Sequence, residues 1–303
     1  MKNLKIALAS LFVPALAVIA LAQGKAQPPS PEPPMLGPHW TRGADHAPPQ
    51  RGGSPDLTWH NGAVMPTTTV EAIYWGPSWS NSSFVGDKIT GLDSFYHDVY
   101  GTTYADTSNE YSAGPTGPYV TSLINYNGHV IDSSSVPKNV SQLTTPVLNE
   151  VCKMITNPVA DGYYPVYVDT PRGNAGFCAY HSYGTCNSKP VQFAFFFNLD
   201  GDAGCDPQDE SGLHSQGLAA LANVTGHELS EARTDPRNGG WLDKSGAENA
   251  DKCAWTFGTP LLSFNGLSQW KIQGNWSNRA YNNNNGYPNG NGQLGCLDGG
   301  NFR

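Results

Sequence analysis

The chain has 303 residues and a formal net charge of −8, from 17 Lys and Arg against 25 Asp and Glu. No basic cluster follows the first residues, which argues against nucleic acid or an anionic membrane as a partner. Residues 56–303 can bury one sizeable core, so we predict a single domain there.

The N-terminal residues predict export. Lys2 and Lys5 precede an apolar run, and residues 1–22 together are typical of a secretory signal peptide. No later stretch is long and apolar enough to cross a membrane, so we expect a secreted protein, extracellular or periplasmic. Residues 23–55 are rich in Pro, Gly and polar residues, which predicts an extended linker or a propeptide.

The following segments predict strands and helices in mixed order. A β-rich run at 67–75, ended by Gly-Pro, is the first expected core strand. Apolar residues at helical spacing predict helices over 87–100 and 142–155, and further strands are expected at 163–168 and 191–199. In the last strand every second residue is apolar, so one face should be buried, with Val191, Phe193, Phe195, Phe197 and Leu199.

A helix is predicted over residues 214–233, ended by Pro236. Its main apolar stripe forms the expected core face, with Leu218, Leu221, Ala222, Thr225, Leu229 and Ala232. The adjoining arc, which should line a cleft, holds Ala220, Val224, His227, Glu228 and Glu231. Gln216, Asn223 and Ser230 would form the polar side. After Trp255 the chain is rich in Gly and Asn, and mainly loops are expected.

This helix contains an H-E-x-x-E motif at His227, Glu228 and Glu231. Four residues turn a helix by about 400°, so His227 and Glu231 lie one above the other and could bind one ion. In the H-E-x-x-H form of zinc peptidases, two histidines hold zinc and the intervening Glu takes a proton from the attacking water. The pattern thus predicts Glu228 as a general base. The alternative is an ordinary polar helix face on which this spacing is incidental.

A catalytic zinc site needs a third protein ligand. Glu248 is the favoured candidate, and Asp251 is expected to orient His227, because thermolysin-like peptidases use a downstream Glu followed by an Asp that orients the first His. Asp235, just after the helix, is the alternative third ligand. One His with two carboxylates is a harder ligand set than two His with one Glu, so Mn²⁺ or Ca²⁺ are alternatives to Zn²⁺.

An electrophile for the developing oxyanion is also expected, and His181 is the candidate, with Tyr180 and His214 as alternatives.

All six cysteines follow the predicted signal peptide, and export favours three disulfides. Two pairings are suggested, Cys178 with Cys186 across a short loop and Cys253 with Cys296 near the C-terminus. A thiolate zinc site is the rival interpretation, but paired C-x-x-C spacing is missing. The full set is Cys152, Cys178, Cys186, Cys205, Cys253 and Cys296.

Three segments resemble a group of exported bacterial proteins. The segments are F-C-A-Y-H, G-H-E-L-S-E-A-R-T-D-P and G-W-L-D-K-S-G-A-E-N-A-D-K-C-A-W. That group shares His-Glu-x-x-Glu-Ala-x-x-Asp-Pro and a downstream Gly-x-Glu-x-x-Asp-x-Cys. The chain is more distantly similar to plant phosphate-induced, exordium-like extracellular proteins, which generally lack the His-Glu pair. The resemblance implies an extracellular scaffold that can also serve a noncatalytic role.

We therefore predict an α/β (α+β) zincin-like domain, with a mixed or antiparallel sheet packed on the H-E-x-x-E helix and disulfide-stapled loops. The expected function is metal-dependent hydrolysis of a peptide or protein aligned along a sheet edge. The alternative is a noncatalytic extracellular or cell-wall protein with a structural metal. Surface aromatics could then contact wall or matrix carbohydrate, the candidates being Trp241, Trp255, Trp270 and Trp276.

Overall fold

The computed structural model describes residues 32–44, 55–160 and 162–303. The predicted signal peptide, residues 1–22, lies outside the described residues, as does most of the predicted linker or propeptide. Residues Glu32 to Arg303 belong to one compact unit, so part of that linker segment is built into the main fold. In the described ranges, no helix is long and apolar enough to span a membrane.

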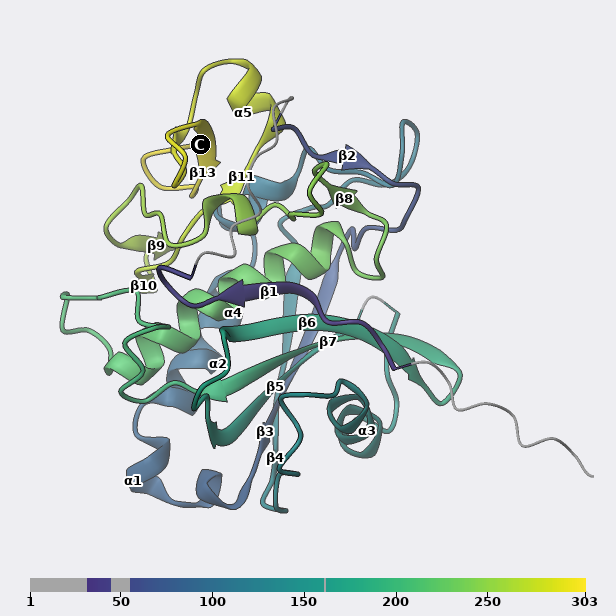
Figure 1. The fold of residues 1–303 in the computed structure, drawn as a ribbon, viewed down its shortest axis with the longest axis vertical. Coiled ribbons are helices and arrows are strands. Elements are labelled where there is room, and N and C mark those ends of the chain that lie inside the picture. Colours follow the sequence, from purple (N-terminus) through teal and green to yellow (C-terminus); the bar gives the residue numbers. More distant parts are fainter. Residues whose placement is uncertain (1–31, 45–54, 161) are drawn as a thin grey trace, which may run out of the picture. The chain divides into compact units, whose positions relative to one another are not determined.

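A six-stranded mixed sheet is the centre of the fold (Figure 1). Four neighbouring strands are parallel, β6 pairs antiparallel to β7, and β1 pairs antiparallel to β6 at the edge. The prediction of a mixed sheet is confirmed. In spatial order the strands are β1 (Leu36–Trp40), β6 (Phe177–Cys186), β7 (Lys189–Asn198), β5 (Gly162–Pro171), β3 (Thr68–Trp75) and β4 (Ile124–Asp132).

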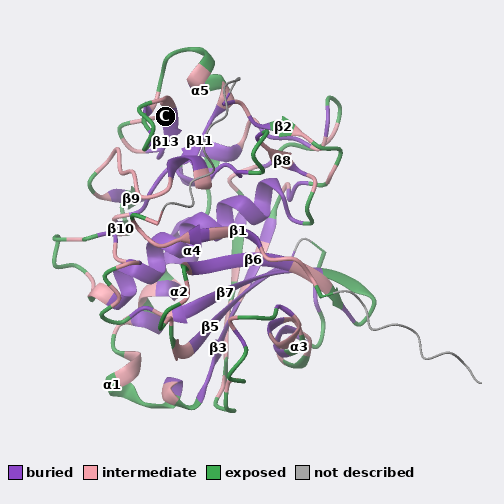
Figure 2. Ribbon diagram, viewed as in Figure 1, coloured by how far each residue is buried: buried purple, intermediate pink, exposed green. Residues whose placement is uncertain are grey.

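Helices cover both faces of this sheet, which explains why its central strands are buried on both sides (Figure 2). The apolar face predicted for β7 is buried, and Leu148 of α3 (Thr145–Met154) lies close against Gly184 on the same side. On the opposite side, the Tyr167 hydroxyl is hydrogen-bonded to Thr225 of α4 (Gln216–Thr234) and to Tyr96 of α2 (Lys88–Asp98).

Helix α4 begins at an N-cap, Ser215, whose side chain accepts a hydrogen bond from the Leu218 amide. The predicted polar side of this helix was wrong. Asn223 and Ser230 are buried, because the C-terminal half of the chain covers them. The Asn223 amide oxygen accepts a hydrogen bond from the Gln273 backbone, and Asn249 donates to Ser230.

The remaining elements are short. After Trp255 the chain is largely loop, as expected, but five small strands and a helix interrupt it. The two-residue strands β2 (Thr58–Trp59) and β8 (Trp241–Leu242) pair with each other, as do β9 (Leu262–Phe264) and β10 (Ser268–Trp270), while β13 (Leu294–Leu297) pairs with β11 (Asn275–Trp276) and β12 (Tyr287–Pro288). The short helices are η1 (Pro77–Ser80), α1 (Ser82–Val85), η2 (Ala105–Ser108), η3 (Asp251–Cys253) and α5 (Asn278–Asn282).

All six cysteines form disulfides: Cys152–Cys186, Cys178–Cys205 and Cys253–Cys296. The Cys253–Cys296 pairing was predicted. The suggested Cys178–Cys186 pairing is wrong, because both residues lie in β6, eight positions apart along the strand, which separates them by roughly 26 Å. The actual bridges tie β6 at one end to α3 and at the other to the loop after β7.

Candidate metal centre

Helix α4 places His227 and Glu231 one turn apart, with both side chains fully buried. The Nε2 atom of His227 lies 3.1 Å from Oε1 of Glu231. This is the i, i+4 relation that the sequence predicted for two ligands on one helix face.

Asp251 completes a first donor group from the loop that follows β8. Its backbone amide donates to Oε1 of Glu231 at 2.9 Å, and its Oδ1 lies 3.7 Å from Nε2 of His227. His227, Glu231 and Asp251 each offer one ligand atom within 4.8 Å of the others. Donors around a tetrahedral zinc ion are roughly 3.4 Å apart, so this group is close to the geometry that a metal requires.

A second donor group shares Glu231 with the first. Strand β6 directs His181 to the α4 side of the sheet, and Nε2 of His181 lies 3.2 Å from both carboxylate oxygens of Glu248. His181, Glu231 and Glu248 also bring one ligand atom each within 4.8 Å of one another. Glu231 is therefore the residue common to both groups.

The predicted ligands His227, Glu231 and Glu248 thus fall into two overlapping groups. Asp251, which was predicted to orient His227, stands beside it with a donor atom of its own, and His181, predicted as an electrophile, stands beside Glu248. The alternative ligand Asp235 caps the end of α4, where its Oδ1 accepts a hydrogen bond from the Gly240 amide at 2.8 Å.

The other electrophile candidates lie elsewhere. Tyr180 follows the strand alternation to the opposite face of the sheet, where its ring stacks on Phe195. His214 precedes α4, stacks on Trp270 with ring centroids 4.2 Å apart, and contacts the Gln269 carbonyl oxygen through Nε2.

Gln273, which sequence reasoning did not single out, orients His227. Its amide nitrogen lies 3.0 Å from Nδ1 of His227 and donates to the Ala250 carbonyl oxygen. In this arrangement the neutral imidazole has its hydrogen on Nε2, toward Glu231. An ion bound at Nε2 would replace that hydrogen and move it to Nδ1, and the Gln273 amide would have to reverse, at the cost of its contacts with the Trp255 amide and the Ala250 carbonyl oxygen.

Burial dominates the electrostatics of the centre. It raises the pKa of Glu231 and of Glu248 well above the usual range, and the neighbouring carboxylates raise the first further. Burial and then Glu248 raise the pKa of Asp251 to about 7. The pKa of His181 falls to about 4 because burial disfavours its charged form. A bound divalent cation would favour ionised carboxylates and neutral histidines together.

Several polar atoms of the centre are buried without a hydrogen-bond partner among the described residues. They include Oε2 of Glu231 and Nδ1 of His181. Such atoms cost free energy unless a partner satisfies them. A cation held by carboxylate and imidazole donors would supply one.

Strand β1 covers the centre, and its residues lie in the segment that the sequence predicted as linker or propeptide. The His39 ring stacks on His227 with centroids 4.0 Å apart and on Trp255 with centroids 4.5 Å apart. Gly37 lies directly against Glu231. Single-sequence reasoning had no signal for these contacts, because a short run containing Gly and Pro does not predict a strand.

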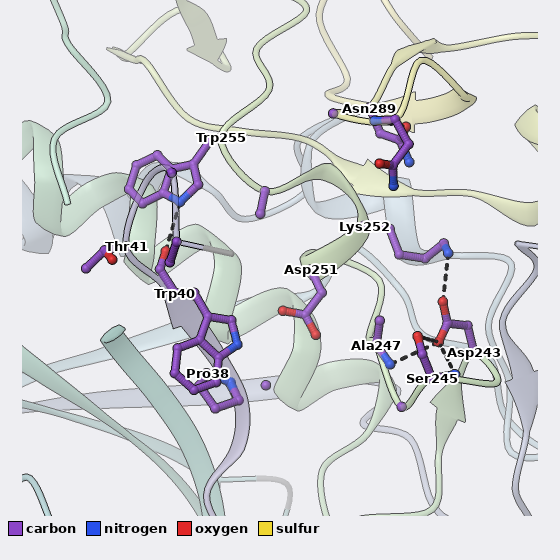
Figure 3. A pocket seen from close by; sticks show the side chains of 17 residues that line it. Pro38, Trp40, Thr41, Asp243, Ser245, Ala247, Asp251, Lys252, Trp255 and Asn289 are labelled. Carbon is purple, nitrogen blue, oxygen red and sulfur yellow. Dashed lines mark hydrogen bonds and ion pairs between the residues drawn. The ribbon is translucent and has the colours of Figure 1, made fainter. Parts of the chain in front are cut away.

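A pocket of about 330 Å³ lies between β1 and the loop that contains Asp251. In Figure 3 the Asp251 carboxylate stands between Pro38 and Trp40 on one side and Ser245 and Ala247 on the other. The Asp251 side chain is 20% exposed, whereas those of His227 and Glu231 are fully buried. The pocket therefore meets the centre at Asp251.

The tryptophans considered for carbohydrate contact are mostly structural. Trp270 and Trp276 are buried, and Trp241 packs on Tyr111. Trp255 is partly buried and lines the pocket, where its indole nitrogen donates to the Trp40 carbonyl oxygen at 2.9 Å.

Comparison with protein-family models, with curated proteins and with solved structures gave no match. The resemblance to exported bacterial proteins rests on the three sequence segments that suggested it.

Proposed function

We propose that this protein is an exported metal-dependent hydrolase that cleaves peptides, with Glu228 as its general base. The position of Glu228 is the observation that supports this most strongly. It follows His227 on α4, is fully buried, and its carboxylate is approached by the His39 backbone of β1 and by no Lys or Arg of the described chain. A buried carboxylate without a cationic side chain as partner, next to metal donors, is suited to proton transfer.

His227, Glu231 and Asp251, or His181, Glu231 and Glu248, would hold the ion. A bound zinc ion supplies acidification of water and polarisation of a carbonyl group. Burial, followed by Asp251 and Glu248, raises the pKa of Glu228 well above its usual value, and a bound cation would favour the ionised form that a general base needs. As the water oxygen bonds to the carbonyl carbon, Glu228 takes its proton and passes it to the leaving nitrogen while the C–N bond breaks.

The sheet edge supports a peptide as substrate. Strand β1 lies extended and antiparallel on β6, and its backbone passes directly over Glu231. An extended peptide could add to β6 in the same way, because a free strand edge offers backbone hydrogen bonds that do not depend on side chains. Three disulfides suit an exported protein.

The substitution Glu228→Gln tests this function. We expect hydrolysis of a mixed peptide library to fall by about 10²- to 10⁴-fold, with zinc content and thermal stability unchanged. Because β1 covers the centre, Glu228→Gln is assayed alone and together with Gly37→Val, whose side chain would collide with Glu231 and displace β1. Glu210→Gln, at an exposed loop residue, is the matched control.

A noncatalytic protein with a structural ion is the second candidate, and the complete burial of His227 and Glu231 favours it. It predicts no hydrolysis in any background and no special effect of Glu228→Gln. Equal peptide cleavage by Glu228→Gln and Glu210→Gln, or no cleavage even with Gly37→Val, would rule out the proposed role of Glu228.

A further inference from the structure

We propose that β1 is a built-in occupant of the peptide-binding groove, so that the full chain is latent until this strand leaves. The inference rests on the proposed function and identifies the ligand that the groove is shaped to hold, an extended peptide with glycine over Glu231. The chain supplies that peptide itself, as residues 36–40 (Figure 1).

The first argument is the close approach of β1 to the centre. A Cβ atom added to Gly37 would lie 1.8 Å from Oε2 of Glu231 and 3.1 Å from Cδ2 of His181. Gly37 also has a φ of +45°, a conformation that favours glycine. The backbone of β1 therefore fills the space directly in front of the donors, where the backbone of a substrate would have to lie.

The second argument is the place of His39. Its ring fits between His227 and Trp255 and is fully buried. Trp255 has a φ of 56°, which is uncommon for a bulky residue and places strain at the same stack. These costs are unexpected for a strand whose only task is to extend the sheet.

The third argument is that β1 adds little to the sheet itself. Strand β6 pairs with β7 in unbroken register, whereas the pairing of β1 with β6 shifts register on both sides of His39. Bulges of this kind are common at sheet edges and next to active sites. Without β1 the sheet would keep five strands, and the free edge of β6 would adjoin the donors.

Hydrogen bonds also anchor the chain at the C-terminal end of β1 and just before its start. The Glu32 carboxylate accepts hydrogen bonds from the Thr144 hydroxyl and from the Thr145 amide and hydroxyl at the start of α3. At the other end Trp255 donates to the Trp40 carbonyl oxygen. Polar anchors flanking a central Gly-Pro are compatible with a strand that can be released without disruption of the core.

The decisive test compares Gly37→Val with Gly43→Val in the full chain. Both glycines have a positive φ, but a Cβ at Gly43 would meet no atom within 4 Å in the described structure. For Gly37→Val we expect backbone amide exchange at Leu36, His39 and Trp40 to rise about a hundredfold or more, with β5 and β7 as protected as in the wild type. Gly43→Val should leave β1 protected.

A labelled synthetic peptide of residues 32–44 supplies the second readout. It should bind the Gly37→Val chain with one-to-one stoichiometry and should not bind the wild type, whose groove is filled. The same peptide with valine in place of Gly37 should not bind either chain. Continued protection of β1 in Gly37→Val, or loss of protection throughout the sheet and α4, would overturn the proposal, as would failure of the peptide to bind.

Glu32→Ala is a milder variant that leaves the core untouched, because Glu32 is exposed. Loss of its three anchoring hydrogen bonds should speed amide exchange in β1 about tenfold or more, confined to that strand. Unchanged exchange would count against a releasable strand. Neither exchange nor peptide binding requires hydrolysis, so a protein that opens and binds the peptide without cleaving substrates would refute the proposed enzyme and not the latency of β1.

Discussion

Asp243 and Glu248 lie in the same loop, yet their surroundings shift their acidities in opposite directions. Burial alone would raise the pKa of Asp243, but hydrogen bonds from Ser245 and Lys252 outweigh it and lower the pKa. Nζ of Lys252 lies 3.0 Å from Asp243. Glu248 faces His181, which is itself held neutral, and the pKa of Glu248 is raised. The two sites differ because Asp243 has a permanent cation beside it, Lys252, whereas Glu248 has a neutral histidine.

A third site, on the opposite face of the sheet, lies between these extremes. Lys153 pairs with both Asp132 and Glu150. The pKa of Asp132 is lowered despite burial, whereas burial and the nearby Asp132 raise the pKa of Glu150 to about 7. One lysine therefore keeps only one of two carboxylates strongly ionised.

The three sites form a series. Asp243 has a lysine of its own, Asp132 and Glu150 share one, and in the described chain Glu231, Glu248 and Asp251 are paired with histidines and with neither Lys nor Arg. Burying carboxylates in this way is costly unless a positive charge accompanies them. The series supports a divalent cation as the partner of the third set.

The largest change in stability is predicted for the replacement of Lys252, the cation beside Asp243. Lys252→Met should destabilise the protein by about 3–5 kcal/mol, because it leaves Asp243 charged and buried. The double variant Asp243→Asn with Lys252→Met should recover much of this loss. Urea unfolding of the wild type and the two variants measures both values. A loss below about 1 kcal/mol in the single variant would contradict the claim that Asp243 depends on Lys252 for its charge.

The set of Glu231, Glu248 and Asp251 should instead be stabilised by added zinc. At a zinc concentration one hundred times Kd, the wild type should gain about 2.7 kcal/mol in its free energy of unfolding. Glu231→Gln should abolish this gain, because Glu231 is the donor common to both groups. Unfolding with and without zinc measures the effect, and Glu210→Gln should respond as the wild type does. Equal stabilisation of Glu231→Gln would exclude Glu231 as a ligand.

The smallest effect on stability is expected at Glu150, which shares Lys153 with Asp132. The pKa of Glu150 is higher in the folded protein than its reference value of 4.5, so folding binds a proton there and stability falls as pH rises from about 4.5 to 7. With allowance for solvent screening, the loss is on the order of 1 kcal/mol. Glu150→Gln should flatten the pH profile of urea unfolding in this window, and an unchanged profile would contradict the assignment.

Much of the fold could be predicted from residue patterns. Strand β7 and helix α4 have strong periodicity, and both were located to within a few residues. Strand β6 was missed because the residues that face the centre or the polar loops break its apolar alternation, His181 among them. The burial of every side of α4 depends on β1 and on the segment near Gln273, which are distant in sequence.

The sequence indicated residues of the candidate site on the helix, in the downstream loop and at His181, but it related only the helical ones to each other in space. His227, Glu228 and Glu231 have a fixed relation on α4, so their spacing was informative. The grouping of Asp251 with His227, and of Glu248 with His181, depends on how a loop folds against β6. Likewise, neither the place of His39 nor that of Gly37 could be inferred, because both depend on the docking of β1.

Metal analysis of the purified full chain is the most direct test of the proposed centre. The wild type and Glu210→Gln should contain at least one zinc ion per chain after dialysis against zinc-free buffer, and His227→Ala should contain much less while remaining folded. A wild-type chain loaded with zinc that retains no stoichiometric metal, or a His227→Ala chain that retains as much as the wild type, would contradict the account.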